Sequence, residues 1–340
     1  MWLPPRAAPL LFLLPLVAVG LSARPARAAA LAPCVATPTV PTDIRGGAGV
    51  GASISEPVDV NGTLFFAADD GVSGRELWKG SGSPVALVRV KDLRPGPPSS
   101  SPEALTAVGS TLFFLIPGAI SGVELWRSDG TDPGTLLLRA FPDMVTALGA
   151  ELTAVGSTLF FVADDGGTGS ELWKSDGTPG GTVLVKDIWP QAEGSFPSRL
   201  TAVGNQLFFN AHDGSSGYEL WKSDGTEQGT LRVKDIADAG LSSNPGELTA
   251  VGQTLYFSAT SVNDSTSLWR SDGTEEGTVL IRDFGDATMV SLRSFTAVGG
   301  TLFLQVQEPE FGEEPDPVIE IDRIVRAKTL EHRRTQRRRE

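Results

Sequence analysis

The chain has 340 residues, with 28 Lys and Arg against 41 Asp and Glu, which gives a formal net charge of −13. Its one Cys, two His and two Tyr rule out a disulfide framework and a Cys-rich zinc site, and leave little for His-dependent catalysis. The acidic balance argues against nucleic-acid binding, whereas 40% hydrophobic residues suffice for a large core. The 39 Gly and 24 Pro favour many short strands over long helices.

Residues 1–30 have the pattern of an export signal. Arg6 precedes an apolar run from Leu10 to Leu21, which is short for a membrane span and contains Pro15. Small residues follow, and Ala26–Ala28 fits an A-x-A cleavage site. The sequence therefore predicts a secreted or cell-surface protein with no transmembrane span after cleavage, although an uncleaved anchor stays open as an alternative.

Two markers repeat along the chain with a period of 47 or 48 residues, which is typical of a repeat architecture. The first marker is a Trp, at Trp78, Trp126, Trp173, Trp221 and Trp269. The second is an apolar triplet that begins at Leu64, Leu112, Leu159, Leu207, Leu255 and Leu302.

Each unit divides into four short strands, here named A to D. In the third unit these are Leu152–Val155, Thr158–Ala163, Glu171–Lys174 and Thr182–Ile188, separated by Gly-containing turns. Four antiparallel strands in this length predict an all-β propeller blade, and the β-propeller is predicted over residues 31–322.

The repeat count predicts six blades. Val318–Ile321 is a degenerate sixth C strand, and Val40–Ile44 resembles a D strand that would complete this blade and close the ring. The alternative is that the chain is a fragment of a longer repeat array.

The string from Glu171 to Thr178 (ELWKSDGT) is identical to the string from Glu219 to Thr226, and the second and fifth units keep most of it. This motif resembles the signature of bacterial ELWxxDGT-repeat proteins, over roughly residues 58–304. The resemblance implies a secreted or surface β-propeller, mostly of unassigned function, with no established catalytic residues.

The repeated residues are expected to build the scaffold. The Trp side chains are predicted to pack between blades, with a sugar-stacking ring of exposed Trp as the alternative. Aspartates before Gly in the C–D turns are expected to bond to turn backbone. Charged pairs on the D strands, such as Lys186–Asp187 and Lys234–Asp235, are expected to protect the outer edge.

The B–C turns raise the possibility of a calcium site, because carboxylates in Gly-bearing loops are calcium ligands. The DxDxDG spacing of a recognised calcium loop is absent, so a purely structural turn is the competing interpretation. The carboxylates concerned are Asp69, Asp70, Asp164, Asp165 and Asp213.

The residues that break the repeat are the candidates for ligand contact, since repeated residues already explain the scaffold. In a propeller, the D–A and B–C loops lie on one face. The contact candidates there are Trp189, Glu193, Phe196, Arg199 and His212, although Trp189 alternatively covers a blade edge.

The last segment, residues 323–340, holds eight Lys and Arg and two Glu, hence 8 − 2 = +6, and is predicted to be a basic disordered tail. Taken together, the sequence predicts a monomeric, non-catalytic binding or structural module for an extracellular protein or glycan. The alternative is a carbohydrate-active enzyme, a glycosidase or lyase, that uses acidic residues on the long-loop face.

Overall fold

The structure is a computed structural model. It describes residue 44 and residues 54–81, 86–118, 121–142, 151–190, 193–238, 240–261, 263–286, 290–307 and 318–320. The predicted export signal and the predicted basic tail lie outside these residues. Among the described residues, no helix has the length and apolar character that membrane crossing requires.

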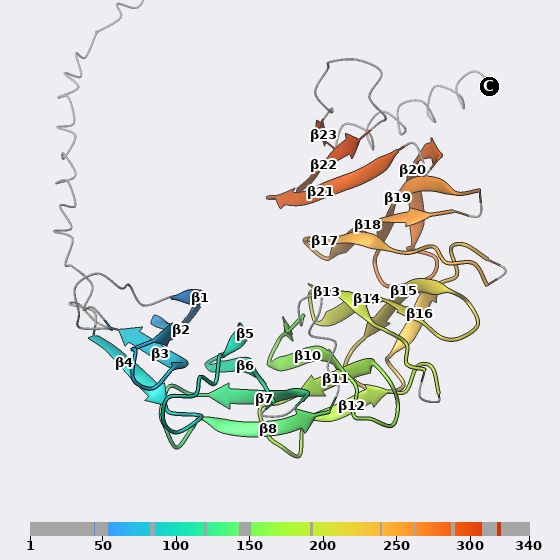
Figure 1. The fold of residues 1–340 in the computed structure, drawn as a ribbon. Helices are drawn as coiled ribbons and strands as arrows, with labels where there is room; N and C mark the ends of the chain where they lie inside the picture. Colours follow the sequence, from blue (N-terminus) through green and yellow to red (C-terminus); the bar gives the residue numbers. More distant parts are fainter. Residues whose placement is uncertain are drawn as a thin grey trace, which may run out of the picture. The chain divides into compact units, whose positions relative to one another are not determined.

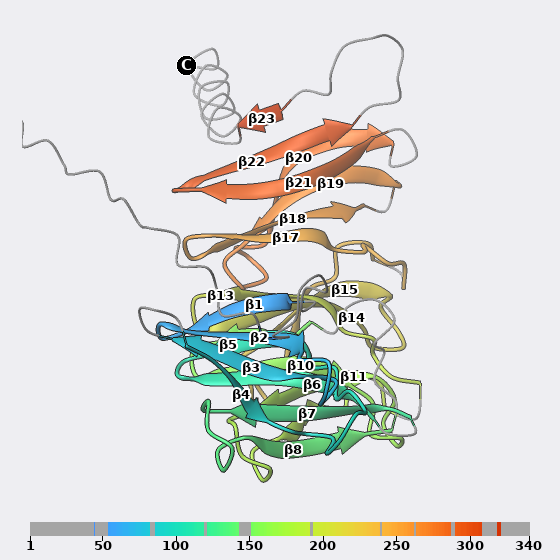
Figure 2. The same cartoon turned by 60° about the vertical axis from the view of Figure 1, so that its left-hand side comes forward.

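The described residues form six antiparallel sheets, each a meander of strands that follow one another in the chain (Figure 1 and Figure 2). The first sheet contains β1 (Ser55–Val60), β2 (Thr63–Asp69), β3 (Arg75–Ser81) and β4 (Ala86–Lys91). The second contains β5 (Glu103–Val108), β6 (Thr111–Pro117), β7 (Val123–Ser128) and β8 (Leu136–Phe141). The third contains β9 (Thr153–Val155), β10 (Thr158–Ala163), β11 (Glu171–Ser175) and β12 (Val183–Lys186).

The remaining sheets follow the same plan. The fourth contains β13 (Ser198–Val203), β14 (Gln206–His212), β15 (Tyr218–Ser223) and β16 (Leu231–Lys234). The fifth contains β17 (Gly246–Val251), β18 (Thr254–Thr260), β19 (Ser265–Ser271) and β20 (Val279–Asp286). The sixth contains β21 (Ser291–Val298), β22 (Thr301–Gln307) and β23 (Val318–Glu320). The predicted four-strand unit, with strands A to D in order, is therefore confirmed, and the fold is a β-propeller.

An apolar cluster lies between each sheet and the next. In every cluster, the Val that ends the A strand of one sheet lies with the Leu that begins the B-strand triplet of the following sheet. The five Val–Leu pairs are Val60 and Leu112, Val108 and Leu159, Val155 and Leu207, Val203 and Leu255, and Val251 and Leu302. One repeated contact thus joins six sheets that could not bury their faces alone.

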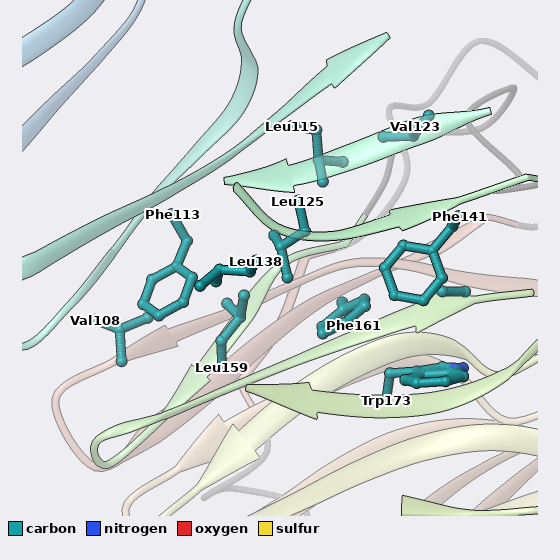
Figure 3. Close-up of a cluster of buried hydrophobic side chains, with 11 residues drawn as sticks. Val108, Phe113, Leu115, Val123, Leu125, Leu138, Phe141, Leu159, Phe161 and Trp173 are labelled. Atoms are coloured by element: carbon teal, nitrogen blue, oxygen red, sulfur yellow. The ribbon is translucent and has the colours of Figure 1, made fainter. Parts of the chain in front are cut away.

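The cluster between the second and third sheets shows how the tryptophans are used (Figure 3). Trp173 is buried and meets Phe141 of the preceding sheet edge to face, with ring centroids 5.2 Å apart. The guanidinium carbon of Arg139 lies 4.3 Å from the centroid of the Trp173 ring. The predicted packing of Trp between blades is confirmed at this position.

Hydrogen bonds within each C–D turn explain why its Asp, Gly and Thr residues repeat. Asp224 Oδ1 accepts from the Thr226 N–H at 2.8 Å and from the Thr226 hydroxyl at 2.7 Å. Gly225 has φ of +88°, and a Cβ at Gly229 would lie 2.1 Å from Asp224 Oδ1. The same aspartate bonds recur at Asp129, Asp176 and Asp272.

Lysines of one sheet bind the C–D turn of the next. Lys174 Nζ donates to the Gly225 carbonyl at 2.7 Å, and Lys222 Nζ donates to the Gly273 carbonyl at 2.6 Å. The D-strand lysine Lys186 donates to the Thr230 carbonyl at 2.9 Å, and Lys234 donates to the Glu275 carbonyl at 3.4 Å. The D-strand lysines, expected to protect an outer edge, therefore also connect neighbouring sheets.

The Glu of the repeated motif fixes the loop that leads to the next sheet. Glu219 is fully buried and accepts from the N–H groups of Ile236 and Ser243 and from the Ser243 hydroxyl. Burial raises the pKa of Glu219 despite these bonds. Glu76 and Glu171 make equivalent bonds, so this carboxylate is part of the scaffold.

The B–C turn after β14 is closed by Asp213. Its carboxylate accepts from the N–H and hydroxyl groups of both Ser215 and Ser216, at 2.7 to 2.9 Å. Burial opposes its ionisation, but these bonds outweigh burial and lower the pKa of Asp213 from 3.8 to about 2.

The predicted closure of the ring is not observed. β23 confirms the degenerate sixth C strand, but the sixth sheet contains three described strands, in the order β21-β22-β23, and the sheets are not closed. Of the predicted closing strand Val40–Ile44, only Ile44 is described, and it lies in a turn. The rest of this predicted strand lies outside the described residues.

We expect Asp224→Ala to destabilise the protein by about 1 kcal/mol, because two turn hydrogen bonds are lost. The midpoint of urea unfolding should fall at an unchanged slope. Glu227→Ala is the matched control, since it is exposed in the same turn and only its backbone carbonyl is bonded there. Equal midpoints for the two variants would show that the Asp224 bonds contribute nothing.

We expect acid to remove the contribution of Asp213 between pH 3.8 and about 2. The folded carboxylate has the lower pKa, so its stabilisation is complete above pH 3.8 and is lost as the pH falls toward 2. The stability difference between wild type and Asp213→Asn should therefore shrink over this window in urea titrations. The control is Asp238→Asn at an exposed position. A difference that stays constant with pH contradicts the assignment.

Candidate functional site

The D–A and B–C loops lie at the same end of their sheets, as the sequence predicted. In the third and fourth sheets, the Phe196 N–H donates to the Ser170 carbonyl, and the His212 N–H donates to the Ser195 carbonyl, both at 3.0 Å. These bonds join residues 193–197 of the D–A loop to the B–C loop before β11 and to the end of β14. We call this end of the sheets, with its D–A and B–C loops, the loop face.

Trp189 and His212 stack on each other at the loop face. Their ring centroids are 4.7 Å apart, with an angle of 26° between the planes, and Tyr218 meets His212 edge to face at 5.1 Å. His212 Nδ1 accepts from the Gly214 N–H at 2.7 Å. A Cβ at Gly214 would lie 2.6 Å from Trp189 Nε1. Trp189 is half-buried over this turn, which favours its covering role over that of a contact residue.

Phe196 and Glu193 are exposed on the D–A loop before β13. Phe196 has a φ of +47° and is 44% exposed. Ser101 and Asn244 take the same conformation, and the N–H of each donates to the carbonyl of the first residue of a C strand. The backbone at this position repeats, and the side chain does not, so Phe196 is an exposed aromatic that the scaffold does not use.

Arg199 lies in a β-bulge of β13, where the strand register shifts between Ser198 and Thr201. Its φ is +59°, and the equivalent residues Glu56, Ala104, Glu247 and Ser294 have nearly the same value. A Cβ at Gly246 of the next sheet would lie 3.7 Å from the Arg199 guanidinium carbon. This is an ordinary van der Waals distance, so the Arg199 guanidinium lies next to Gly246.

A polar pocket of about 610 Å³ opens beside Arg199, and we call it the A-strand pocket. Three successive sheets form the pocket. Its lining residues lie on β13, on β17 and just before it, on β18 and on β21. The lining residues are Arg199, Asn244, Gly246, Glu247, Ser258, Leu292, Arg293 and Ser294.

The charged groups of the A-strand pocket differ in how they are bonded. Glu247 Oε2 accepts from the Phe295 N–H at 3.3 Å, and Arg293 Nε donates to the Ser291 hydroxyl at 3.2 Å. None of the ion pairs between described residues includes Arg199 or Arg293. The pocket therefore carries two arginines and one carboxylate, a local positive balance in an acidic protein.

Two further carboxylates, one on an A strand and one just before an A strand, make the same kind of bond as Glu247. Glu56 accepts from the Leu105 N–H at 3.2 Å, and Glu151 accepts from the Leu200 N–H at 2.7 Å, each in the following sheet. Of the residues that line the pocket, the sequence pattern indicated Arg199 alone, and it did not indicate Glu56 or Glu151. A usable signal exists, because Glu56, Glu151 and Glu247 all precede the A-strand Val by four positions.

Glu103 is a partly buried carboxylate at the start of β5. Burial raises its pKa, and the negative charge of Glu56 raises it further. A carboxylic acid with a raised pKa next to an ionised carboxylate is one requirement of glycosidase chemistry.

The five candidate calcium ligands are hydrogen-bonded within their own turns. Asp70 accepts from Val72 and Ser73, Asp165 accepts from Gly167 and Thr168, and Asp213 is bonded as described above. Asp69 and Asp164 each accept from the Gly two positions later. Arg89 and Arg139 form ion pairs with Asp70 and Asp165. In the described parts of the chain, no three acidic, His or Cys side chains are grouped to hold a metal ion. Calcium binding stays a prediction.

No family model matches the chain, and no curated protein matches it. Several solved structures are similar to it. One is a prolyl endopeptidase, with 15% identity, 76% of this chain and 40% of that chain covered, and a TM-score of 0.49. Another is the β-propeller domain of the Trilobed protease from Pyrococcus furiosus, with 11% identity, 78% and 81% coverage, and a TM-score of 0.43.

Oligopeptidase B from Leishmania major is similar at 12% identity, with 75% of this chain and 37% of that chain covered and a TM-score of 0.44. The chain thus spans about two fifths of the length of the endopeptidase and oligopeptidase chains. Likeness at this level carries no information on activity. The propeller assignment of the described residues rests on their own sheet topology and inter-sheet packing.

Proposed function

We propose that this propeller is a secreted or cell-surface, non-catalytic binding module that takes a carboxylate group of an extracellular glycan or protein into the A-strand pocket. The observation that carries the proposal is the bonding of the pocket charges. Arg199 and Arg293 have no carboxylate partner among the described residues, whereas Glu247 already accepts a backbone N–H. A pocket of this kind offers donors to an anion.

Arginine suits this task because its planar guanidinium donates two parallel hydrogen bonds to a carboxylate. Arg199 has a left-handed backbone in a bulge of β13, and Arg293 directly precedes Ser294, which has the same backbone in a bulge of β21. Neighbouring strands hold both bulges, so the backbone positions of the two arginines are fixed. Phe196, three residues before Arg199, offers an exposed ring to an apolar part of the ligand. The pocket is locally positive, whereas the whole chain has a net charge of −13. Because the whole chain repels anions and the pocket attracts them, an anionic group is expected to bind at the pocket and not elsewhere on the surface.

The carbohydrate-active alternative has its support in Glu103 and Glu56, away from the residues that line the A-strand pocket. Among those lining residues there is one carboxylate, whereas a glycosidase requires two that flank the scissile bond. Shortening of an oligosaccharide by the wild type, abolished in Glu103→Gln, would favour the enzyme.

We expect uronic-acid oligosaccharides or acidic peptides to bind the wild-type chain, and matched neutral oligosaccharides or amidated peptides not to bind. Arg199→Gln and Arg293→Gln should each weaken binding about tenfold or more, because hydrogen bonds to charged groups contribute roughly 1.5–3 kcal/mol. Titration calorimetry measures the affinity, and the two ligand sets distinguish a glycan from a protein source.

Arg270→Gln is the matched control, since Arg270 is an exposed arginine on β19 that does not line the pocket. If Arg270→Gln weakens binding as much as Arg199→Gln, the pocket is not the site. If neither ligand set binds the wild type, the proposed recognition of a carboxylate is wrong.

A further inference from the structure

The first and the sixth sheet of the described residues each expose one residue of the Val–Leu pair that joins successive sheets. We call these two sheets the end sheets. Val298 of β21 is 60% exposed, whereas the five equivalent Val residues are 5–9% exposed. Leu64 of β2 is 42% exposed, whereas the five equivalent Leu residues are 0–2% exposed. Both anomalies fall on the one contact pair that occurs in all five inter-sheet clusters.

The direction of this contact is fixed. In all five clusters, the Val belongs to the earlier sheet and the Leu to the later sheet. Val298 belongs to the sixth sheet, the last sheet of the described residues, and would need a Leu from a following sheet. Leu64 belongs to the first sheet and would need a Val from a preceding sheet. The two exposed side chains are therefore complementary halves of the same interface.

Neighbouring residues show how far the exposed part of each face extends. On the sixth sheet, Thr296 and Ala297 are exposed and Phe303 is half-buried, although four of its equivalents, Phe65, Phe113, Phe160 and Phe208, are 1–2% exposed. On the first sheet, Phe66 is buried, and Trp78 is half-buried as its equivalents Trp126 and Trp269 are. The exposed part of the first face is thus its Leu64 end, which lies at the A–B turn, as Val298 does.

We propose that the sixth sheet of one copy of this chain binds the first sheet of a second copy, with Val298 packed against Leu64. The argument is continuity with an established interface, because the chain forms this contact five times within itself. In the structure, Val298 and Leu64 of one chain are both exposed. A second copy presents the same surface.

The two halves are different surfaces, so the contact is heterologous and runs head to tail. Each copy keeps one unused face after pairing, and association continues until a ring closes or a filament grows. Assembly then depends on protein concentration, and blocking either face removes it. Neither Val298 nor Leu64 lines the A-strand pocket, so the proposed contact does not depend on the proposed ligand.

Sedimentation velocity of the full chain over a range of concentrations tests the proposal. We expect oligomers that grow with concentration in the wild type, and monomers in Val298→Asp and in Leu64→Asp, because a charge at either position is desolvated by the contact. Val72→Asp is the control, since Val72 is 75% exposed in a B–C turn away from both faces, and it should assemble like the wild type.

A mixing experiment separates this contact from non-specific association. An equimolar mixture of Val298→Asp and Leu64→Asp retains one intact interface, between Val298 of the Leu64→Asp copy and Leu64 of the Val298→Asp copy. The mixture should therefore form dimers and nothing larger. A wild type that is monomeric at every concentration overturns the proposal, as does a mixture that stays monomeric. A monomeric wild type whose melting temperature falls in both variants would show closure within one chain instead.

Discussion

The apolar contact between successive sheets is the interaction on which the rest of this structure depends. A four-stranded sheet of this size has two apolar faces and cannot bury both alone. The Val at the end of one A strand and the Leu at the start of the next B strand meet in each of the five clusters, with Phe and Trp around them. Removing large side chains from such clusters costs several kcal/mol each, so this contact determines which residues must repeat.

The polar part of the repeat serves the same assembly. Each Asp of the C–D turns holds a tight turn whose carbonyls face outward, and Lys174 and Lys222 of the preceding sheet donate to those carbonyls. The buried Glu of the motif holds the loop that enters the next sheet, as Glu219 does through Ser243. The conspicuous ELW and DGT residues are therefore structural, which explains why the repeated motif contributes no residue to the A-strand pocket.

The candidate ligand-contact residues occupy backbone positions whose conformation repeats from sheet to sheet, whereas the side chain at each of these positions differs between the sheets. Phe196 occupies the position of Ser101 and Asn244, and Arg199 that of Glu247 and Ser294. The scaffold holds all of them in the left-handed conformation, which non-glycine residues adopt only when surrounding structure enforces it. A fixed backbone with a free choice of side chain is a means of placing an arginine beside a pocket without disturbing the blade.

The sequence by itself determined the strand order, the turns and the blade, because a period of 47 or 48 residues and alternating turn chemistry are local and repeated signals. It also predicted that Arg199 and Phe196 lie on the loop face. Only the tertiary structure decided that Glu56, Glu151 and Glu247 bind the next sheet, that Trp189 covers a turn, and that the end sheets leave Val298 and Leu64 exposed. Those outcomes depend on contacts between residues of different sheets or of different loops, and no pattern within a single repeat contains such contacts.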